Sequence, residues 1–598
     1  MNEKDRRWNL DVLFKSFDDP AFAAGLDAYR EYVRNINEWA EKNLAGTKNV
    51  KEKLEEYIGK VNELDAHSAM EMYASLSLEA DTRNEAAEKA CDAVRTIDAE
   101  MVKSAVIFRK FISGVDDIDA VIDSSALLRQ YAFALKEAHN QSRHMLSEAE
   151  EILYAKLQQV GSDAFSLMVN QLTATLTVDM ERDGAIEKIP LSAARNLAND
   201  PDPAVRKAAY EAELKAYDQV DKPIAAGLNA IKGDAILQAR LRGFDTVLDM
   251  TLFNGRMERA TLEAMLEAIR EKIPVLRRYY RKKAAGLGHD GGLPFYDLVA
   301  PAGEVAMTFT YDEACDFVVK VFTGYSKKMG DFARHCFDND WIDPFPRPGK
   351  SGGAFCAGVW NIRESRILSN FDGSYNSVET LAHELGHAYH NLCLKDVGFM
   401  NRLFTSCLAE TASNYCEIIV EDAALKSAAD TGMCDGEAKK RRMAILDNSL
   451  RSAVMVVIDI YSRFLFEDEF IRRRQNGPLS VREINELMLW AQRESYGDGL
   501  DPEYLHKYMW ACKVHYYSAN ANYYNFPYTY GLLFARGIYA KYLNEGDAFL
   551  DKYDSLLAET GRHSLEGVGK IAGLDVTNKE FWLGSLGMIE KMVDEFCE

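Results

Sequence analysis

The sequence has few of the residues that crosslink chains or interrupt helices. Its 10 cysteines among 598 residues are scattered, with no Cys-x-x-Cys spacing. This pattern predicts neither a disulfide framework nor a cysteine-bound zinc, and free thiols are typical of a reducing compartment. There are only 14 prolines, and apolar residues recur at helical spacing over long stretches, beginning with residues 21–170. The sequence therefore predicts a mainly α fold.

Long apolar runs are also lacking. No run approaches the roughly 18 consecutive apolar residues that a membrane-spanning helix needs. The charged residues 1–8 are not followed by the apolar segment of a secretory signal. These absences predict a cytoplasmic protein without a membrane partner.

Positive charge is in deficit. The chain has 71 lysines and arginines against 93 acidic residues, a formal net charge of −22. Such a surface argues against nucleic acid as a partner, and against anionic membranes. Acidic walls would favour basic or neutral peptides, although a solvated acidic surface that maintains solubility explains the charge more simply.

The length predicts more than one lobe. With 47% hydrophobic residues the chain can bury a large core. Residues 199–203 contain two prolines and two aspartates between helical segments, which is typical of a connection. We therefore expect an N-terminal helical lobe over residues 1–200 and a catalytic domain over residues 201–598.

One short motif carries recognisable chemistry. His383 and His387 flank Glu384-Leu385-Gly386 in a segment with helical periodicity. Asn376 and Glu379 resemble a capping box at its start. On a helix the two imidazoles leave the same face one turn apart, which suits two ligands of one tetrahedral zinc. Glu384 projects beside them, where a carboxylate can take a proton from a metal-bound water.

A third protein ligand is expected from the next helical segment, residues 405–420. Glu410 lies among small and apolar residues, where an unpaired carboxylate is costly. We assign Glu410 as the third ligand and leave the fourth position to water. Glu417 and Asn414 are candidates to orient a histidine from outside the ligand set.

Two other interpretations of this motif were weighed. The glutamates could be surface charges and the histidines ordinary polar residues, but that does not explain Gly386, a poor helix former, between the histidines. A gap there suits the close approach of a substrate or another backbone. His390 extends the same face, yet the spacing of a three-histidine metzincin site is absent, so His390 is interpreted as a neighbour.

These motifs resemble those of a zinc metallopeptidase family, peptidase family M3, which includes thimet oligopeptidase, and particularly its oligoendopeptidase F type. The resemblance rests on His383-Glu-Leu-Gly-His387 and Ala409-Glu-Thr-Ala-Ser413, and is strongest over residues 350–535. It implies a two-lobed helical metallopeptidase with zinc in a deep central channel that admits short peptides.

Residues 354–371 have the β-branched and aromatic content of a hairpin and lead directly into the motif. A strand beside a peptidase zinc can bind substrate backbone by β-augmentation. A purely structural hairpin is the alternative, and the resemblance favours substrate contact.

Residues 515–531 are rich in tyrosine and asparagine around a proline and a glycine. A zinc hydrolase needs a donor for the oxyanion that forms on the carbonyl. The resemblance implies His515, Tyr524 and Tyr528 in this role, with Tyr523 and Tyr530 as rivals. Tyrosines packed between lobes are the alternative.

The sequence thus predicts an oligoendopeptidase that uses one Zn²⁺ per chain and cleaves internal bonds of short peptides. A dipeptidyl carboxypeptidase is an alternative, but it needs a cation for the substrate's terminal carboxylate, and the sequence places none. A catalytically inert helical peptide-binding protein is another, which the intact Glu384 disfavours. Cobalt or manganese could accept the same ligands, and the oligomeric state is left open.

Overall fold

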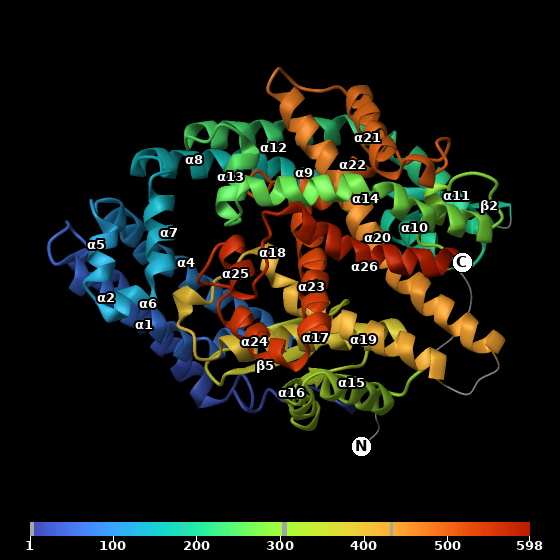
Figure 1. Cartoon of the computed structure of the whole chain (residues 1–598). Coiled ribbons are helices and arrows are strands. Elements are labelled where there is room, and N and C mark those ends of the chain that lie inside the picture. The colour runs from blue at the N-terminus through green and yellow to red at the C-terminus, as the bar shows by residue number, and fades with distance from the viewer. Residues whose placement is uncertain (1–4, 183, 302–307, 431–434) are drawn as a thin grey trace. The chain divides into compact units, whose positions relative to one another are not determined.

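The computed structural model describes residues 5–182, 184–301, 308–430 and 435–598. In these ranges the chain is mainly α-helical with small sheets, which confirms the predicted fold class (Figure 1). Unit 1 comprises Met1–Met145, Ala306–Ala423 and Lys541–Gly573, and unit 2 comprises Leu146–Val305, Ala424–Ala540 and Leu574–Glu598. The lobe border near residue 200 and the central channel stay predictions.

Unit 1 contains two groups of helices and a small sheet. Its elements are α1 (Pro20–Asn43), α2 (Val50–Asn62), α3 (Ala69–Ala80), α4 (Glu85–Ser113), α5 (Ile118–Asp123), α6 (Ala126–Gln130), α7 (Ala132–Ser142), α15 (Tyr311–Tyr325), α16 (Lys327–Asp338), β3 (Ile342–Asp343), β4 (Phe355–Val359), β5 (Glu364–Leu368), α17 (Tyr375–Leu394), α18 (Ser406–Ala409), most of α19 (Thr411–Asp430), α24 (Leu550–Ala558) and α25 (Leu565–Ile571).

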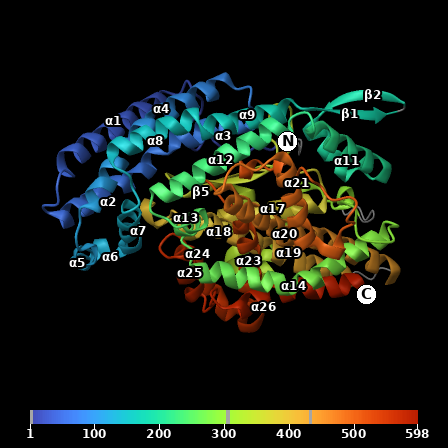
Figure 2. The same cartoon turned by 90° about the horizontal axis from the view of Figure 1, so that it is seen from above.

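Unit 2 is a helical assembly with one hairpin. Its elements are α8 (Glu148–Val160), α9 (Ser162–Thr175), β1 (Thr177–Arg182), β2 (Ala185–Pro190), α10 (Leu191–Asn196), α11 (Pro203–Tyr217), α12 (Asp221–Leu241), α13 (Val247–Asn254), α14 (Arg259–Gly286), α20 (Asp435–Arg474), α21 (Val481–Tyr496), α22 (Met509–Cys512), most of α23 (Phe526–Glu545) and α26 (Lys579–Cys597). The strands β1 and β2 pair antiparallel, and α26 packs along α14 (Figure 2).

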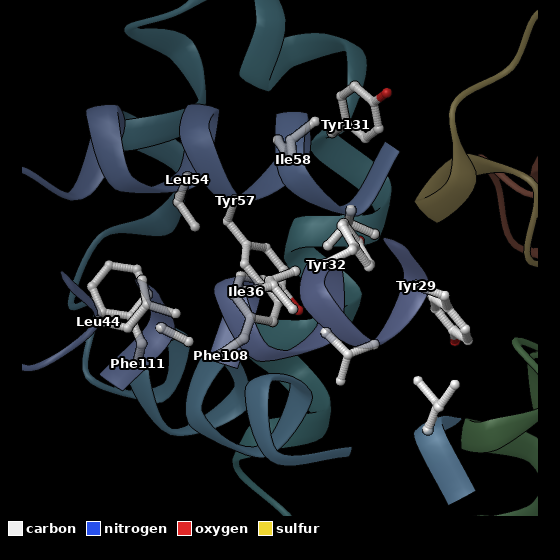
Figure 3. Packing of buried hydrophobic residues seen from close by; sticks show 14 of the residues in the cluster. Tyr29, Tyr32, Ile36, Leu44, Leu54, Tyr57, Ile58, Phe108, Phe111 and Tyr131 are labelled. Atoms are coloured by element: carbon white, nitrogen blue, oxygen red, sulfur yellow. The ribbon is translucent and has the colours of Figure 1, made fainter. Parts of the chain in front are cut away.

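The first helices of unit 1 enclose a hydrophobic core (Figure 3). Tyr57 of α2 stacks on Phe108 of α4, with ring centroids 4.0 Å apart and planes 7° from parallel. Leu54 of α2 is fully buried and Ile36 of α1 nearly so. Burying each large apolar side chain contributes about 1.5–3 kcal/mol, so this core holds α1, α2 and α4 together.

The predicted hairpin at residues 354–371 is confirmed as β4 and β5. The sheet order is β3-β5-β4, with β3 parallel and β4 antiparallel to β5. Helix α17 packs on β4 and β5, and Asn391 Nδ2 donates to Ser365 Oγ at 3.1 Å. The helix that carries the His383–His387 motif is thereby attached to the sheet.

The N-cap of helix α17 lies two residues before the predicted cap. Ser374 is the N-cap, and its hydroxyl accepts from the backbone N–H of Ser377 at 3.2 Å. The prediction that Asn376 caps the helix is wrong, because Asp372, Ser374 and Ser377 form a hydrogen-bonded group that starts the helix earlier.

Two composition-based predictions concern the whole chain. Every cysteine within the described ranges is a free thiol, as the lack of Cys-x-x-Cys spacing predicted. Among the helices of the described residues, none combines the length and apolar character that a membrane crossing requires.

Candidate metal centre and active site

Three side chains of unit 1 converge at one point. His383 and His387 leave the same face of α17, and Glu410 approaches them from between α18 and α19. The two Nε2 atoms are 3.2 Å apart, and Glu410 Oε2 lies 3.3 Å from His383 Nε2 and 3.4 Å from His387 Nε2. The structure thus brings the three predicted ligands together as a group able to hold a metal ion.

The spacing of these atoms fits a tetrahedral cation. Ligands on a tetrahedral zinc with bonds of about 2.0–2.1 Å lie about 3.3–3.4 Å from one another. The three observed separations, 3.2, 3.3 and 3.4 Å, match the edges of one face of such a tetrahedron. A fourth corner is left for a non-protein ligand, as catalytic sites require.

Charge at this point also favours a cation. Burial lowers the pKa of His383, but hydrogen bonds to Glu410 and Glu417 outweigh burial and raise it to about 10. Burial raises the pKa of Glu410, yet the two histidines outweigh it and hold this pKa well below its usual range. The carboxylates of Glu410 and Glu417 therefore favour a positive charge, a proton or a metal ion, at the histidines.

Glu410 stands at a break that sequence periodicity did not predict. The expected single helix over residues 405–420 is two helices, α18 and α19, with Glu410 between them at φ −90° and ψ 6°. Ser413 donates its hydroxyl to Glu410 Oε2 at 3.0 Å. The break and this hydrogen bond together orient the carboxylate toward the histidines.

Glu417 supports the histidine from behind, as expected. Its Oε1 lies 2.8 Å from His383 Nδ1, two helical turns from Glu410 along α19. A carboxylate on Nδ1 leaves Nε2 as the nitrogen that can bind a metal. Asn414, the other candidate, donates its backbone N–H to the Glu410 carbonyl at 3.0 Å.

Glu384 is buried beside the histidines. The residue is only 5% exposed, and its Oε2 makes no hydrogen bond to any described residue. Burial raises its pKa, while His383 and His387 oppose the shift. A buried carboxylate oxygen without a partner is costly unless a ligand or water meets it, so this atom is available to a bound molecule.

Gly386 marks the closest approach of two helices. A Cβ at this position would lie 2.5 Å from the carbonyl oxygen of Ala412 and 2.7 Å from Cα of Ser413, both in α19. The gap predicted between the histidines is therefore filled by the backbone of α19. Only glycine allows α17 and α19 to approach this closely, which brings Glu410 and Glu417 within reach of His383.

His390 lies away from the three-residue group. It is 1% exposed, its Nε2 pairs with Thr560 Oγ1 at 2.9 Å, and its ring stacks on Phe404. Burial lowers its pKa to about 3. His390 is thus a neutral core residue outside the three-residue group, consistent with its interpretation as a neighbour of that group.

A second cluster lies in unit 2. His515 stacks on Tyr524 with ring centroids 5.5 Å apart and packs against Tyr528 at 6.1 Å, and the two tyrosines are 5.7 Å apart. Tyr524 is 39% exposed, and His515 and Tyr528 are half-buried. The three residues proposed as oxyanion donors therefore form one group with access to solvent.

The rival tyrosines point elsewhere. Tyr523 is buried and its hydroxyl donates to Asp468 Oδ1 at 2.8 Å. Tyr530 is fully buried and packs on Phe534 and Trp582. Their burial leaves Tyr524 and Tyr528 as the tyrosines of this stretch that a substrate can reach.

Sequence reasoning missed the support of this cluster. Lys232 Nζ lies 2.7 Å from Glu467 Oε1 and 2.8 Å from Asn522 Oδ1, all three side chains being buried. Glu467 also accepts from the backbone N–H of Tyr523 at 3.0 Å and from Asn525 Nδ2 at 2.8 Å. No local pattern reveals this pair, because its members are 235 residues apart.

Comparisons with known proteins identify the family of this chain. The family model "Peptidase family M3" matches residues 196–588, and the model "Oligopeptidase F" matches residues 114–177. Oligopeptidase PepF of Bacillus subtilis is 25% identical over 99% of this chain and 87% of its own length. Group B oligopeptidase PepB of Streptococcus agalactiae is 24% identical over 78% of this chain and 76% of its own.

Solved structures share the fold. A Chlamydophila abortus chain superposes with a TM-score of 0.85 at 19% identity, covering 100% of this chain and 98% of that one. Oligoendopeptidase-F of Enterococcus faecium has a TM-score of 0.65 at 20% identity, with 96% and 98% covered. Since the family model matches well over half of its residues, the chain belongs to peptidase family M3, of the oligoendopeptidase F type, and is a metallopeptidase that hydrolyses peptide bonds.

Proposed function

We propose that this metallopeptidase is a zinc-dependent oligoendopeptidase that cleaves internal bonds of short peptides. The observation that carries the metal assignment is the set of three nearly equal distances between His383 Nε2, His387 Nε2 and Glu410 Oε2. Two imidazoles and a carboxylate are a common ligand set of catalytic zinc. When bound, zinc supplies a Lewis acid that lowers the pKa of a water toward ~7 and polarises the scissile carbonyl.

Glu384 is the proposed general base and acid. Its unpartnered, buried Oε2 accepts one proton from the attacking water, whose oxygen bonds to the carbonyl carbon. As the C–N bond breaks, the same carboxyl donates that proton to the leaving amine. The carboxylate is thereby restored for the next cycle, and no other co-reactant is needed.

His515, Tyr524 and Tyr528 are the proposed donors to the substrate oxygen. Their mutual packing and partial exposure support this role. A phenol O–H or an imidazole N–H directed at the carbonyl oxygen stabilises the charge that develops there.

The edge of β4 is the proposed site for the substrate backbone. Within the described residues β4 pairs on one side only, with β5, so its other backbone edge is open to an extended peptide. Backbone pairing tolerates many side chains, which suits a peptidase that acts on varied short peptides.

Cleavage of a mixed peptide pool beside an unfolded protein of matching composition tests the proposal, with products read by mass spectrometry. We expect internal cuts in the peptides only, lost on chelation and in Glu384→Gln. Glu384→Gln should retain its metal, because the residue is no ligand. Full turnover in that variant would refute the assigned base.

The same assay discriminates the other possibilities. Equal cutting of the unfolded protein would contradict a size limit on substrates while leaving the metal chemistry intact. Peptides with a blocked C-terminus should be cut as readily as free ones, whereas a dipeptidyl carboxypeptidase would spare them. Metal binding without any cleavage would indicate a peptide-binding protein.

A further inference from the structure

A cavity of about 190 Å³ lies within unit 2, lined by residues that the proposed reaction does not use. Its charged and polar walls come from α10, α11, α20 and the segment before and after α22. They include Arg195, Arg206, Glu213, Asp459, His506 and Lys513. Liquid water occupies about 30 Å³ per molecule, so the cavity has the volume of about six waters and suits a molecule the size of one amino acid.

The carboxylates of this cavity already have cationic partners. Glu213 Oε1 accepts from Arg195 Nη1 at 2.9 Å. Asp459 is paired with Arg463, one turn along α20, and accepts from Tyr496 OH at 3.1 Å. These charges are therefore balanced without a ligand.

The second arginine of the wall, Arg206, is balanced in the same way. Its Nε donates to Asp297 Oδ1 at 2.6 Å, and both side chains are buried. A ligand is not needed to compensate this guanidinium either.

Lys513 is the remaining cation of the cavity wall. Among the described residues, no hydrogen bond or ion pair reaches its Nζ, although the side chain is half-buried and lines the cavity. Burial lowers its pKa, and Arg463 and Arg195 lower it further, while Asp459 opposes them. A cation in this position is stabilised by any anion that enters the cavity.

His506 provides a second unsatisfied group. The residue is 2% exposed and lines the same cavity. Its Nε2 is 3.4 Å from Glu213 Oε1, and neither ring nitrogen makes a hydrogen bond within the described part of the chain. The Nε2 atom thus has an ion-pair contact with Glu213, whereas Nδ1 has no partner among the described residues. A buried ring nitrogen without a partner is unusual, and a polar atom of a bound molecule would satisfy it.

Most of the remaining wall is apolar, although Asn199 and the tyrosines Tyr210, Tyr296 and Tyr496 also line it. Phe295, Leu298, Met455 and Met509 line the cavity together with small alanines. A ligand that combines one anionic group with a hydrocarbon body matches both parts of this wall. Inorganic phosphate or a sugar would leave the apolar wall without a complementary surface.

We propose that this cavity binds the carboxylate of a small, mostly apolar acid, supplied by a free amino acid or by the C-terminal residue of a short peptide. The carboxylate accepts from Lys513 Nζ, and its hydrocarbon part packs on the phenyl and thioether side chains. The cavity shares no residue with the three-residue metal group. The proposed binding of an acid therefore does not depend on the proposed zinc mechanism.

The test uses the full-length, metal-loaded protein and two ligands of equal shape, 4-methylpentanoate and its uncharged amide. Titration calorimetry should show the acid binding about ten- to hundredfold more tightly than the amide, because only the acid accepts a charge-assisted hydrogen bond. Lys513→Met should remove this preference, and Lys513→Arg should keep it. Equal affinity for acid and amide would overturn the proposal.

A second measurement locates the ligand without any change at Lys513. Methyl resonances of ¹³C-methyl-methionine protein should shift for Met455 and Met509 when the acid is added. Unchanged methyl resonances of these two would overturn the proposal. So would acid binding that survives in Lys513→Met but is lost on chelation, since the acid would then be on the metal.

Leucine and glycyl-leucine distinguish the two sources of the carboxylate. The cavity should discriminate between them at least severalfold in affinity, because the dipeptide carries an extra residue beyond the volume for one amino acid. Binding of either one that depends on Lys513 supports the site, and binding of neither up to millimolar concentration contradicts it.

Discussion

At the scale of single residues, the metal group depends on contacts between side chains and one missing side chain. His383 is held on both ring nitrogens, by Glu417 at Nδ1 and by the ligand group at Nε2. Gly386 lets the helix that carries Glu417 come close. Each contact can be changed separately.

Glu417→Gln should weaken metal binding roughly ten- to hundredfold, since the loss of an outer carboxylate lowers the basicity and orientation of the histidine it holds. Competition with a calibrated chelator measures this affinity. Glu52→Gln, an exposed position on α2, is the matched control and should leave the affinity unchanged. An unaltered affinity in Glu417→Gln would show that the 2.8 Å contact is structural only.

Gly386→Ala should destabilise the protein by about 1–3 kcal/mol, because the new methyl group meets backbone atoms of α19 that cannot rotate away. The variant should also lose metal affinity, since Glu410 and Glu417 move with α19. Urea unfolding and metal analysis give the two values.

Gly59→Ala is the control for helix propensity. Gly59 lies exposed within α2 with open space at its Cβ, so alanine should stabilise by about 0.5–1 kcal/mol. If both alanine variants gained stability, the close approach of α17 and α19 would be disproved.

At the scale of elements, the aromatic cluster depends on the turn that precedes α23 as well as on the helix, since Tyr524 lies in the turn and Tyr528 in α23. Tyr523 has a positive φ of 54°, which is unfavourable for a bulky residue. The buried Lys232–Glu467 pair binds the backbone N–H of Tyr523 and the side chains of Asn522 and Asn525. This pair compensates the strained turn and directs Tyr524 outward.

Glu467→Ala should cost about 3–5 kcal/mol, because Lys232 would remain buried without its counter-charge. The near-ultraviolet circular dichroism of the tyrosines should change as well, and turnover should fall more than metal content. Glu469, on the same helix, pairs with exposed arginines. Glu469→Ala should therefore cost less than about 1 kcal/mol of stability. Similar losses in the two variants would contradict a special role for the buried pair.

At the scale of the whole molecule, metal binding is expected to add to stability. The ligands come from α17 and from the break between α18 and α19, and a cation that binds only the folded chain stabilises it by mass action. At a free concentration of 100 times Kd the gain is about 2.7 kcal/mol.

Chelation should therefore lower Tm, and added zinc should restore both Tm and activity. Calorimetry over a series of free zinc concentrations measures the first, and peptide cleavage the second. Cobalt and manganese are the comparison ions, and Glu410→Ala should show little response to any of them. A Tm that is independent of metal in the unmodified protein would count against the three-residue site.

The sequence by itself determined the histidine pair and the position of the proposed base beside it, because the i, i+4 spacing on a helix is local. It also indicated Glu410, since an unpaired carboxylate among apolar neighbours is costly. The helix start at Ser374 and the break at Glu410 were not predicted, because several residues in each segment can cap or interrupt a helix.

Only the tertiary structure decided which tyrosines are accessible and which cations lack partners. Tyr523 and Tyr524 are adjacent in sequence, yet one is buried and the other 39% exposed, because the backbone turns sharply between them. Within the described ranges no hydrogen bond or ion pair reaches Lys513 Nζ, whereas Arg195, Arg206 and Arg463 pair with the nearby carboxylates. The Arg206–Asp297 pairing joins segments 91 residues apart, so local sequence patterns carry no record of it.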